Sequence, residues 1–437
     1  MAKLALLGGE KVRNTPFPSH PVLGKEEKKE ILEVLKTGVL SGFVAKMGDG
    51  FLGGPKVKKL EEEFCKYFNV RHAITINSAT AGLHIALAAT GIGPGDEVIV
   101  TPYTMSATST SILMANAIPV FADIEDETYG LDPKKVEQAI SDKTKAIIVV
   151  HLFGHPAKMD EIMAIARKHN LIVIEDCAQA PGAIYNGRFV GTIGRIGIFS
   201  FNQHKTITTG EGGVAITNDE NFARRMRLIR NHAENIVDSL PEEESIVNLI
   251  GWNYRMTEIE AAIGIGQFHK LDMLTEHRIG LANYLSDGIN KLKSGITPAK
   301  VSARCKSVYF VLPMRYDEEK VGIARDTFVK AVVAEGVAVA AGYAKPQHLR
   351  RTYREKIGYG SKGCPFSCPF YGKEIRYGKG MLPVAEKLYN HELLITSLCH
   401  YPLKKSDMDD IVRAFEKVLE NKDDLKDIKA QQGSMVK

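Results

Sequence analysis

Short apolar runs alternate with helix-like segments between Val70 and Thr217. Several runs are unbroken stretches of Val, Ile and Leu, a pattern typical of strands buried on both faces of a parallel sheet. The predicted strands are Ala73–Ile76, Val98–Thr101, Ile118–Ala122, Ala146–Leu152, Leu171–Ile174, Ile196–Phe201 and Val214–Thr217. This alternation predicts an α/β domain with a mostly parallel sheet and helices on both faces.

Helix signals fill the intervals between these runs. Asp132-Pro133 opens one helix, and Ala79–Ala89 is helix-like directly after the first strand. Met159–His169 carries apolar residues at helical spacing. From Met256 to Leu274 apolar residues recur at spacings of three and four, which predicts one long amphipathic helix that bridges a large domain and a smaller one.

The last part of the chain mixes strand and helix patterns and predicts a small α+β domain. Ser307–Pro313 is predicted to be a strand, and Arg325–Glu335 and Lys405–Leu419 are predicted helices. Tyr353–Gly380 is rich in Gly, Pro, Cys and Tyr without periodicity, so we expect a long loop. We divide the chain into an N-terminal segment that packs on the small domain (1–30), the large domain (31–284), the small domain (285–420) and a frayed tail (421–437).

The composition is that of a soluble globular protein, with 44% hydrophobic and 25% charged residues among 437. The net charge of +5 without a basic tract argues against nucleic acid as a partner. No apolar run has the length of a membrane span, and the N-terminus lacks the features of a signal peptide. Six cysteines form no disulfide framework in so long a chain, so we expect the cytoplasm. Cys364 and Cys368 are too few ligands for structural zinc, and we expect no metal.

Polar residues follow two of the predicted strands, at the sheet edge where α/β proteins bind ligands. Asn77-Ser-Ala-Thr80 opens a helix, and its N–H groups could hold a phosphate, or its hydroxyl could simply cap the helix. Asp176 follows Leu171–Ile174, and a buried carboxylate there needs a cation, such as a protonated ring nitrogen. Gln179 offers an amide one helical turn later. A helix cap explains Asp176 equally well.

The segment Phe199–Gly213 (FSFNQHKTITTGEGG) is the most informative part of the chain. It places Lys205 between aromatic-flanked strands and ahead of a tight turn, which favours a buried amine. Desolvation lowers the pKa of a lysine, and a neutral amine can form a Schiff base with a carbonyl compound. The GEGG turn is not a dinucleotide fingerprint, because it lacks the GxGxxG spacing before a helix.

Together these elements resemble the DegT/DnrJ/EryC1/StrS family of pyridoxal 5'-phosphate (PLP) aminotransferases, which have the aspartate-aminotransferase fold type I. The matching motifs follow family order over nearly the whole chain: Leu7-Gly-Gly, Ser41-Gly42, Asn77–Leu83, Gly93–Val98, Val150–Gly154, Glu175–Ala180, Phe199–Gly213, Gly251–Met256 and Pro383–Glu386. The resemblance implies a seven-stranded, mostly parallel large domain, a smaller α+β C-terminal domain and a homodimer with shared active sites.

The same resemblance implies roles for individual residues. Lys205 matches the lysine that forms the Schiff base with PLP, and Asp176 matches the carboxylate that pairs with the pyridinium nitrogen. Gln179 matches the residue near the ring hydroxyl. The matches to phosphate-binding residues are Ala79, Thr80 and Ser200, together with Asn253, which in the family reaches the cofactor of the neighbouring subunit.

The chain departs from the family in the Pro102-Tyr-Thr-Met105 turn. Met105 stands where the family has an aromatic residue that stacks on the cofactor ring. Either the thioether packs on the ring or the register shifts and Tyr103 stacks. We place Tyr103 and Arg255 beside the substrate, with Arg255 binding the donor carboxylate. An interface salt bridge explains Arg255 equally well.

The activity implied by the resemblance is PLP-dependent transfer of an amino group from glutamate or glutamine. The acceptor would be a keto-sugar, keto-sugar acid or keto-cyclitol, in amino-sugar biosynthesis for a surface polysaccharide or a secondary metabolite. One alternative is a sugar dehydratase of the same fold, in which histidine replaces the lysine, and Lys205 argues against it. The other is a non-catalytic PLP-binding regulator, which the intact set of matching residues disfavours.

Overall fold

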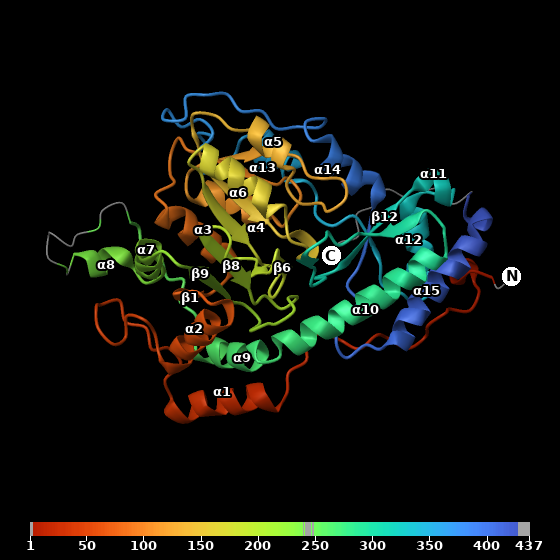
Figure 1. The fold of residues 1–437 in the computed structure, drawn as a ribbon, viewed down its shortest axis with the longest axis horizontal. Coiled ribbons are helices and arrows are strands. Elements are labelled where there is room, and N and C mark those ends of the chain that lie inside the picture. The colour runs from red at the N-terminus through yellow and green to blue at the C-terminus, as the bar shows by residue number, and fades with distance from the viewer. Residues whose placement is uncertain (1–2, 239, 241–245, 247–248, 427–437) are drawn as a thin grey trace.

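The computed structural model describes residues 3–238, 240, 246 and 249–426. A seven-stranded sheet is the centre of the part that we call the large domain (Figure 1). Across the sheet the strands are β1 (His72–Ile76), β9 (Gly213–Thr217), β8 (Ile196–Ser200), β5 (Ile172–Asp176), β4 (Thr144–Val150), β2 (Glu97–Val100) and β3 (Ile118–Phe121). β9 alone runs in the direction opposite to the other six strands of this sheet. The predicted mostly parallel sheet is confirmed, and each strand lies within two residues of its predicted bounds.

Helices cover both faces of this sheet. Successive residues of a strand point to opposite faces, so an unbroken apolar strand has apolar side chains on both faces that helices must cover. On β4, Ile147 and Val149 belong to one apolar cluster, and Ala146 and Ile148 belong to another. This burial on both sides explains the unbroken apolar runs. The helices of the large domain are α1 (Lys25–Thr37), α2 (Pro55–Phe68), α3 (Ala79–Ala89), α4 (Ser106–Met114), α5 (Pro133–Gln138), α6 (Met159–Lys168), α7 (Glu220–Arg230), α8 (Ala233–Val237) and α9 (Glu258–Phe268).

The prediction of one long helix after the sheet is wrong. The chain forms α9 and then α10 (Leu271–Lys291), with a break between Phe268 and Leu271. Lys270, inside the break, donates to both carboxylate oxygens of Glu27 on α1, at 2.7 and 2.8 Å. The apolar spacing continues across the break because Phe268 and Leu271 pack in the same cluster. Spacing alone therefore hides the break.

Helix α10 leads into the small domain, which is built on a four-stranded antiparallel sheet (Figure 1). Its strands are, in order, β10 (Ile296–Pro298), β12 (Leu312–Tyr316), β14 (Leu393–Thr396) and β13 (Ala340–Ala341). Its helices are α11 (Glu318–Val321), α12 (Arg325–Ala334), α14 (Pro383–Lys387) and α15 (Lys405–Glu420). The short helix α13 (Arg351–Arg354) lies against the large domain instead, where Tyr353 contacts Ser109 of α4. The expected α+β character is confirmed. A minor sheet joins β11 (Cys305–Lys306), β6 (Ile184–Tyr185) and β7 (Arg188–Phe189).

The predicted strand Ser307–Pro313 is wrong except for its last two residues, because β12 begins only at Leu312. Residues 307–310, which we call the crossing segment, contact the large domain instead. The Val308 N–H donates to the Gly154 carbonyl at 3.0 Å, and the Phe310 N–H donates to the Phe153 carbonyl at 2.9 Å. A β-strand and a buried irregular segment can have the same run of apolar residues, so the apolar pattern does not distinguish between them.

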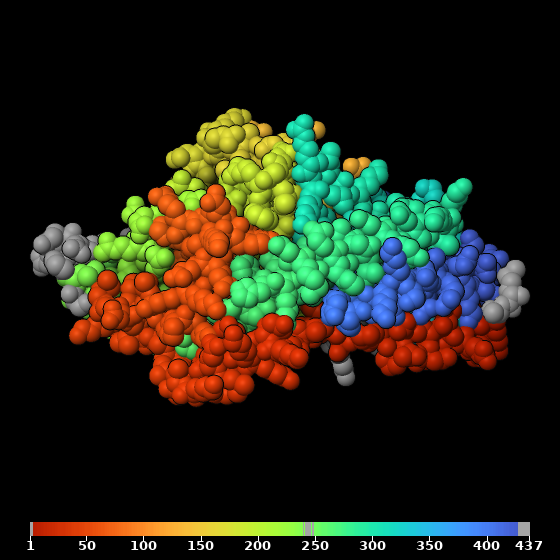
Figure 2. Space-filling view, turned by 60° about the horizontal axis from the view of Figure 1, so that its bottom comes forward, coloured from red at the N-terminus to blue at the C-terminus, as the bar shows by residue number. Residues whose placement is uncertain are grey.

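The first part of the N-terminal segment lies along the small domain beside α15, red against blue in Figure 2. Its last residues, from Lys25, begin α1, where Glu27 accepts from Gln267 of α9 in the large domain. Leu4 is buried in the small-domain core, and Arg13 pairs with Asp407 at 2.8 Å. Leu425, in the short helix that follows α15, is buried in the same core. Residues 427–437 of the expected tail lie outside the described residues.

The Tyr353–Gly380 segment follows the outer edge of the large sheet. Its tyrosine hydroxyls make three contacts there: Tyr353 with Ser109, Tyr371 with Glu97, and Tyr377 with the Pro119 carbonyl. The segment therefore covers the edge strand β3, which would otherwise expose unpaired backbone groups. In the described part of the chain, no helix combines the length and apolar character that a bilayer span requires.

Candidate active site

Two adjacent carboxylates, Glu175 and Asp176, stand at the carboxyl end of β5. Because side chains alternate along a strand, the two carboxylates point to opposite faces of the sheet. Both are buried, with exposed fractions of 0% for Glu175 and 5% for Asp176. Their hydrogen-bond partners therefore decide which of them is available to a ligand.

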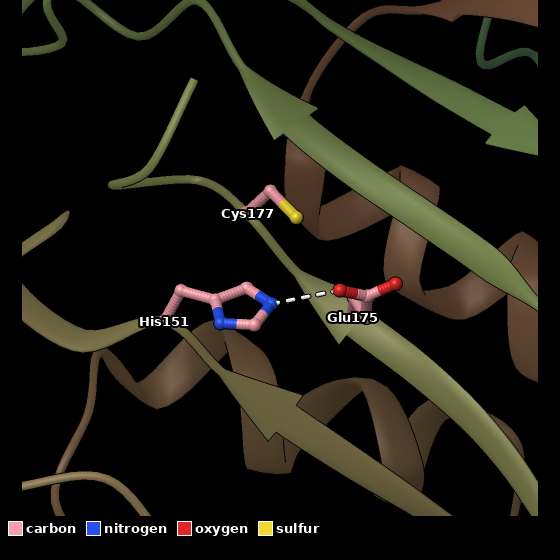
Figure 3. Close-up of side chains that lie close together, drawn as sticks. All are labelled: His151, Glu175 and Cys177. Atoms are coloured by element: carbon pink, nitrogen blue, oxygen red, sulfur yellow. Dashed lines mark hydrogen bonds and ion pairs between the residues drawn. The ribbon is translucent and has the colours of Figure 1, made fainter. Parts of the chain in front are cut away.

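Protein donors satisfy both oxygens of Glu175. Oε1 accepts hydrogen bonds from the N–H groups of Ile193 at 2.7 Å and Gly194 at 2.6 Å. Oε2 accepts from the Gly191 N–H at 2.8 Å and from Nε2 of His151 at 2.9 Å (Figure 3). A carboxylate has about four lone-pair sites. Four donors therefore use the full capacity of Glu175.

The atoms of His151, Glu175 and Cys177 that could bind a metal lie within 4.8 Å of one another (Figure 3). His151 Nδ1 accepts a hydrogen bond from the Ala157 N–H at 3.1 Å, so Nε2 carries the proton donated to Glu175. Burial raises the pKa of the Cys177 thiol well above its usual range, which keeps the sulfur protonated. Since these groups are engaged or neutral, the cluster supports the end of β5 rather than binding a metal.

Asp176 has fewer partners than Glu175. Its Oδ2 accepts from Thr108 Oγ1 at 2.8 Å, and its Oδ1 accepts from the Ala178 N–H at 3.1 Å. Thr108 lies in the first turn of α4, directly beyond the Pro102–Met105 turn. With two donors, the carboxylate keeps the capacity to accept a hydrogen bond from a protonated nitrogen.

Lys205 lies in the loop between β8 and β9, with its amine in the field of Asp176. Burial lowers the pKa of Lys205 to about 8, and the Asp176 carboxylate opposes that shift. Two hydrogen bonds hold the loop: the Lys205 N–H donates to the Asn202 carbonyl, and His20 Nε2 donates to the Lys205 carbonyl, both at 2.9 Å. Near pH 8 about half of these amines are neutral and can act as nucleophiles.

Strand β9 brings Ser200 and the N-terminus of α3 together. Ser200 pairs with Gly213, and a Cβ at Gly213 would lie only 3.0 Å from the Ala79 nitrogen. A residue without a Cβ is needed for this approach. Ala79 and Thr80 begin α3, and the first N–H groups of a helix have no acceptor within it. These groups and the Ser200 hydroxyl form a cradle suited to an anion.

The helix-cap interpretation is confirmed for the Asn77–Thr80 segment, because Ser78 Oγ accepts from the Ala81 N–H of α3 at 3.1 Å. It is wrong for Asp176, because residues 177–183 form turns and no helix begins there. The bond from the Ala178 N–H to Asp176 belongs to such a turn. The Ser78 cap uses one N–H group of α3 and leaves those of its neighbours available, so capping and ligand binding are compatible there.

The amide of Gln179 is held by two residues. Its Oε1 accepts from the Phe153 N–H at 2.7 Å, and its Nε2 donates to the Tyr343 hydroxyl at 3.0 Å. Tyr343 comes from the small domain, and burial raises its pKa to about 12. Tyr103 is fully buried, and its hydroxyl accepts from the Tyr343 N–H at 2.9 Å. In this arrangement Tyr103 supports the Tyr343 loop and offers no exposed ring for stacking.

Met105, Asn253 and Arg255 lie outside this buried set. Met105 is 56% exposed, Asn253 is exposed and Arg255 is half-buried. Burial lowers the pKa of Arg255, and its Nε has no hydrogen-bond partner among the described residues. The loop of Asn253 and Arg255 is close to the cradle in the same chain, because the Asn77 N–H donates to the Tyr254 carbonyl at 3.0 Å. These residues can therefore meet a ligand or a second subunit.

Sequence reasoning missed four residues around the site: Thr108, His20, Phe310 and Tyr343. Thr108 follows a strand-end turn, a position that could have been singled out. The other three contact the site from distant parts of the chain, and no local pattern marks them. Phe310 is the nearest to the chemistry, with its ring centroid 4.5 Å from Lys205 Nζ.

Comparison with known proteins connects this geometry to a family. The profile of the DegT/DnrJ/EryC1/StrS aminotransferase family matches residues 23–388. The chain is 34% identical over 428 residues to a putative L-glutamine:3-amino-2,3-dideoxy-scyllo-inosose aminotransferase of Micromonospora echinospora, covering 96% of this chain and 97% of that protein. It is 36% identical over 333 residues to GDP-perosamine synthase of Caulobacter vibrioides, covering 76% and 85%. An aminotransferase structure from Psychrobacter cryohalolentis matches with a TM-score of 0.78 and 31% identity, covering 93% and 99%.

Proposed function

This chain belongs to the DegT/DnrJ/EryC1/StrS aminotransferase family, and we propose that it binds PLP through Lys205 and transfers an amino group from glutamate or glutamine to a ketone. The chain is an aminotransferase. The observation that carries the proposal is the amine of Lys205, which burial holds at a pKa of about 8 beside Asp176. A reactive amine and a charged carboxylate at the carboxyl ends of parallel strands fit this chemistry.

The residues at the strand ends suit each part of PLP. The cradle of Ala79, Thr80 and Ser200 suits the phosphate, because helix N-termini favour anions. Asp176 has capacity for the ring nitrogen. Gln179 is held by Phe153 and Tyr343, which suits it to lie against the ring hydroxyl.

When bound, PLP supplies an electron-accepting ring that stabilises negative charge at the α-carbon of an amino acid. Asp176 keeps a neighbouring nitrogen protonated, since a buried carboxylate favours positive charge close to it. Lys205, when its amine is free, has a pKa near working pH. It can therefore take a proton from the substrate α-carbon and return it to another position.

We propose a homodimer in which Asn253 of each subunit reaches the cofactor phosphate of the other. Exposed apolar side chains support this proposal, because monomers rarely expose contiguous apolar patches of this kind. They include Leu32, Leu35, Val39, Leu40, Val44, Ile250 and Trp252. Val44 and Trp252 lie near each other, because both contact adjacent residues. Asn231 donates to the Val44 carbonyl, and the His232 N–H donates to the Trp252 carbonyl. Arg255, in the same loop as Asn253, would bind the carboxylate of the donor.

The names of two relatives point to carbohydrate-like substrates. One is a putative aminotransferase of an amino-inosose, and the other is a GDP-perosamine synthase. We propose that the acceptor is a keto-sugar, keto-sugar acid or keto-cyclitol. The reaction would be a cytoplasmic step in amino-sugar biosynthesis, for a surface polysaccharide or a secondary metabolite.

The first test is the donor half-reaction of the PLP-loaded protein. Glutamate or glutamine should bleach the yellow absorption and release one 2-oxo acid per site. A panel of keto-sugars, keto-sugar acids and inososes should then restore the colour with the accepted ketone. A protein that stays yellow with both donors is not a transaminase for them and would fit a regulator instead.

A further inference from the structure

The aromatic ring of Phe310 faces the amine of Lys205. The distance from Nζ to the ring centroid is 4.5 Å. At this distance an ammonium group is attracted to the negative face of the ring. Phe310 ends the crossing segment, so this contact joins the reactive loop to the chain that leads into the small domain.

Hydrogen bonds hold both the N–H and the carbonyl of Phe310. Its N–H donates to the Phe153 carbonyl at 2.9 Å, and its carbonyl accepts from Arg278 Nη1 at 3.2 Å. The same Arg278 nitrogen donates to the Tyr309 carbonyl at 3.3 Å, and Arg278 is buried on α10. Tyr309 has φ +48°, a conformation that non-glycine residues adopt rarely. The backbone that carries the ring is therefore fixed by its surroundings.

We propose that Phe310 is a positioning residue that holds the free amine of Lys205 within the site between proton transfers, and that Arg278 acts through Phe310. The inference rests on the proposed role of Lys205 as the reactive amine. Lysine carries its charge on a flexible four-carbon stem. A ring at the end of that stem restricts the amine to positions from which it can reach the substrate.

The ring also opposes the effect of burial on the amine. Burial lowers the pKa of Lys205 to about 8, whereas an aromatic face favours the charged form. The titratable and charged groups around this loop come from five parts of the chain: Asp176 on β5, His20 in the N-terminal segment, His204 and Glu211 in the same loop, Arg278 on α10, and His400, whose ring lies beside that of His20. Burial lowers the pKa of His20 to about 4, so His20 is neutral near pH 7. Loss of the ring should therefore move the pKa of Lys205 further down.

The test is a pH titration of Lys205 in the full chain without PLP. Lysine labelled with ¹³C at Cε is followed by NMR, and the Lys205 signal is assigned by its loss in Lys205→Arg. Phe310→Leu should lower the pKa of Lys205 by roughly 0.5 to 1 unit. Phe310→Tyr keeps the ring and should titrate like the wild type. Phe17→Leu removes a ring that faces Arg13 at 4.0 Å, and it should leave Lys205 unchanged.

Arg278→Lys tests the same inference without altering the ring, and it should move the titration in the same direction by less. An unchanged pKa of Lys205 in folded Phe310→Leu or folded Arg278→Lys would overturn the inference. A shift in Phe310→Tyr equal to that of Phe310→Leu would overturn it too. The donor half-reaction is measured separately on wild-type holoenzyme. Failure of that reaction rejects the proposed function and leaves the titration result standing.

Discussion

Glu175 and Asp176 are neighbours in the chain, and both are buried, yet their surroundings differ. Glu175 meets four protein donors, three of them backbone N–H groups of a single loop. Asp176 meets two donors and faces the buried amine of Lys205. Burial alone therefore does not mark a site. An incomplete set of partners beside a reactive group does.

The two carboxylates also contribute differently to the stability of the fold. A fully satisfied buried carboxylate ties together the elements that donate to it, so removing its charge disrupts folding. A partly satisfied carboxylate beside a desolvated amine adds less to stability and can bind a ligand. We therefore expect that substitutions of Asp176 and Lys205 mainly change activity, whereas substitutions of Glu175 and its partner His151 mainly change stability.

Lys205→Ala should have the largest effect. Loss of the amine removes both the covalent anchor and the proton carrier, so turnover should fall by at least about 10⁴-fold. The measurement is 2-oxo acid release from glutamate or glutamine in the presence of an accepted ketone. Near-normal turnover in this variant would contradict the role of Lys205 as the reactive amine.

Asp176→Asn should come next. The amide has the same shape but cannot hold a neighbouring nitrogen in its protonated form, so turnover should fall by about 10² to 10³-fold. The melting temperature of the protein without PLP should change little. A large loss of stability with retained activity would place Asp176 on the structural side instead.

Glu175→Gln should show the opposite behaviour. The new amide N–H₂ group would face backbone N–H donors in place of an acceptor, which costs about 2–4 kcal/mol of unfolding free energy. Denaturant unfolding measures this loss, and the activity of the folded fraction should stay within a few-fold of wild type. A stable but inactive Glu175→Gln variant would show that the division between the two carboxylates is wrong.

Lys205→Met should change how the stability of the protein depends on pH. The pKa of Lys205 falls from 10.5 to about 8 on folding, so between these pH values the unfolded chain binds more protons and stability rises with pH. Below pH 8 the buried ammonium costs about 3 kcal/mol, at 1.36 kcal/mol per pKa unit. Without PLP, Lys205→Met should therefore be more stable than wild type at pH 7. That advantage should disappear as the pH approaches 10.5, and a difference that is constant with pH would contradict the buried charge.

The strands and their polar ends were predictable from local information. Unbroken runs such as Ala146–Leu152 follow from burial on both sheet faces, and the lysine in Phe199–Gly213 stands out by its surroundings in the sequence. The Lys205 side chain is half-buried, and desolvation lowers the pKa of its amine to about 8. Asp176 was also marked by its place at the end of an apolar run.

Contacts between segments that are distant in the sequence could not be predicted from local patterns. At the break between Phe268 and Leu271, Lys270 contacts a glutamate on α1 that is far away in the sequence. Tyr103 was predicted beside the substrate, but the structure buries it against the backbone of Tyr343 in the small domain. Alternation of side chains assigns Glu175 and Asp176 to opposite faces, but it does not say which face contains the site.

The most direct test of the account is to reduce the PLP-loaded protein with borohydride, digest it and locate the modified peptide by mass spectrometry. We expect one pyridoxyl group, attached to Lys205 in the Phe199–Gly213 region. Attachment to another lysine, or to none, would contradict it.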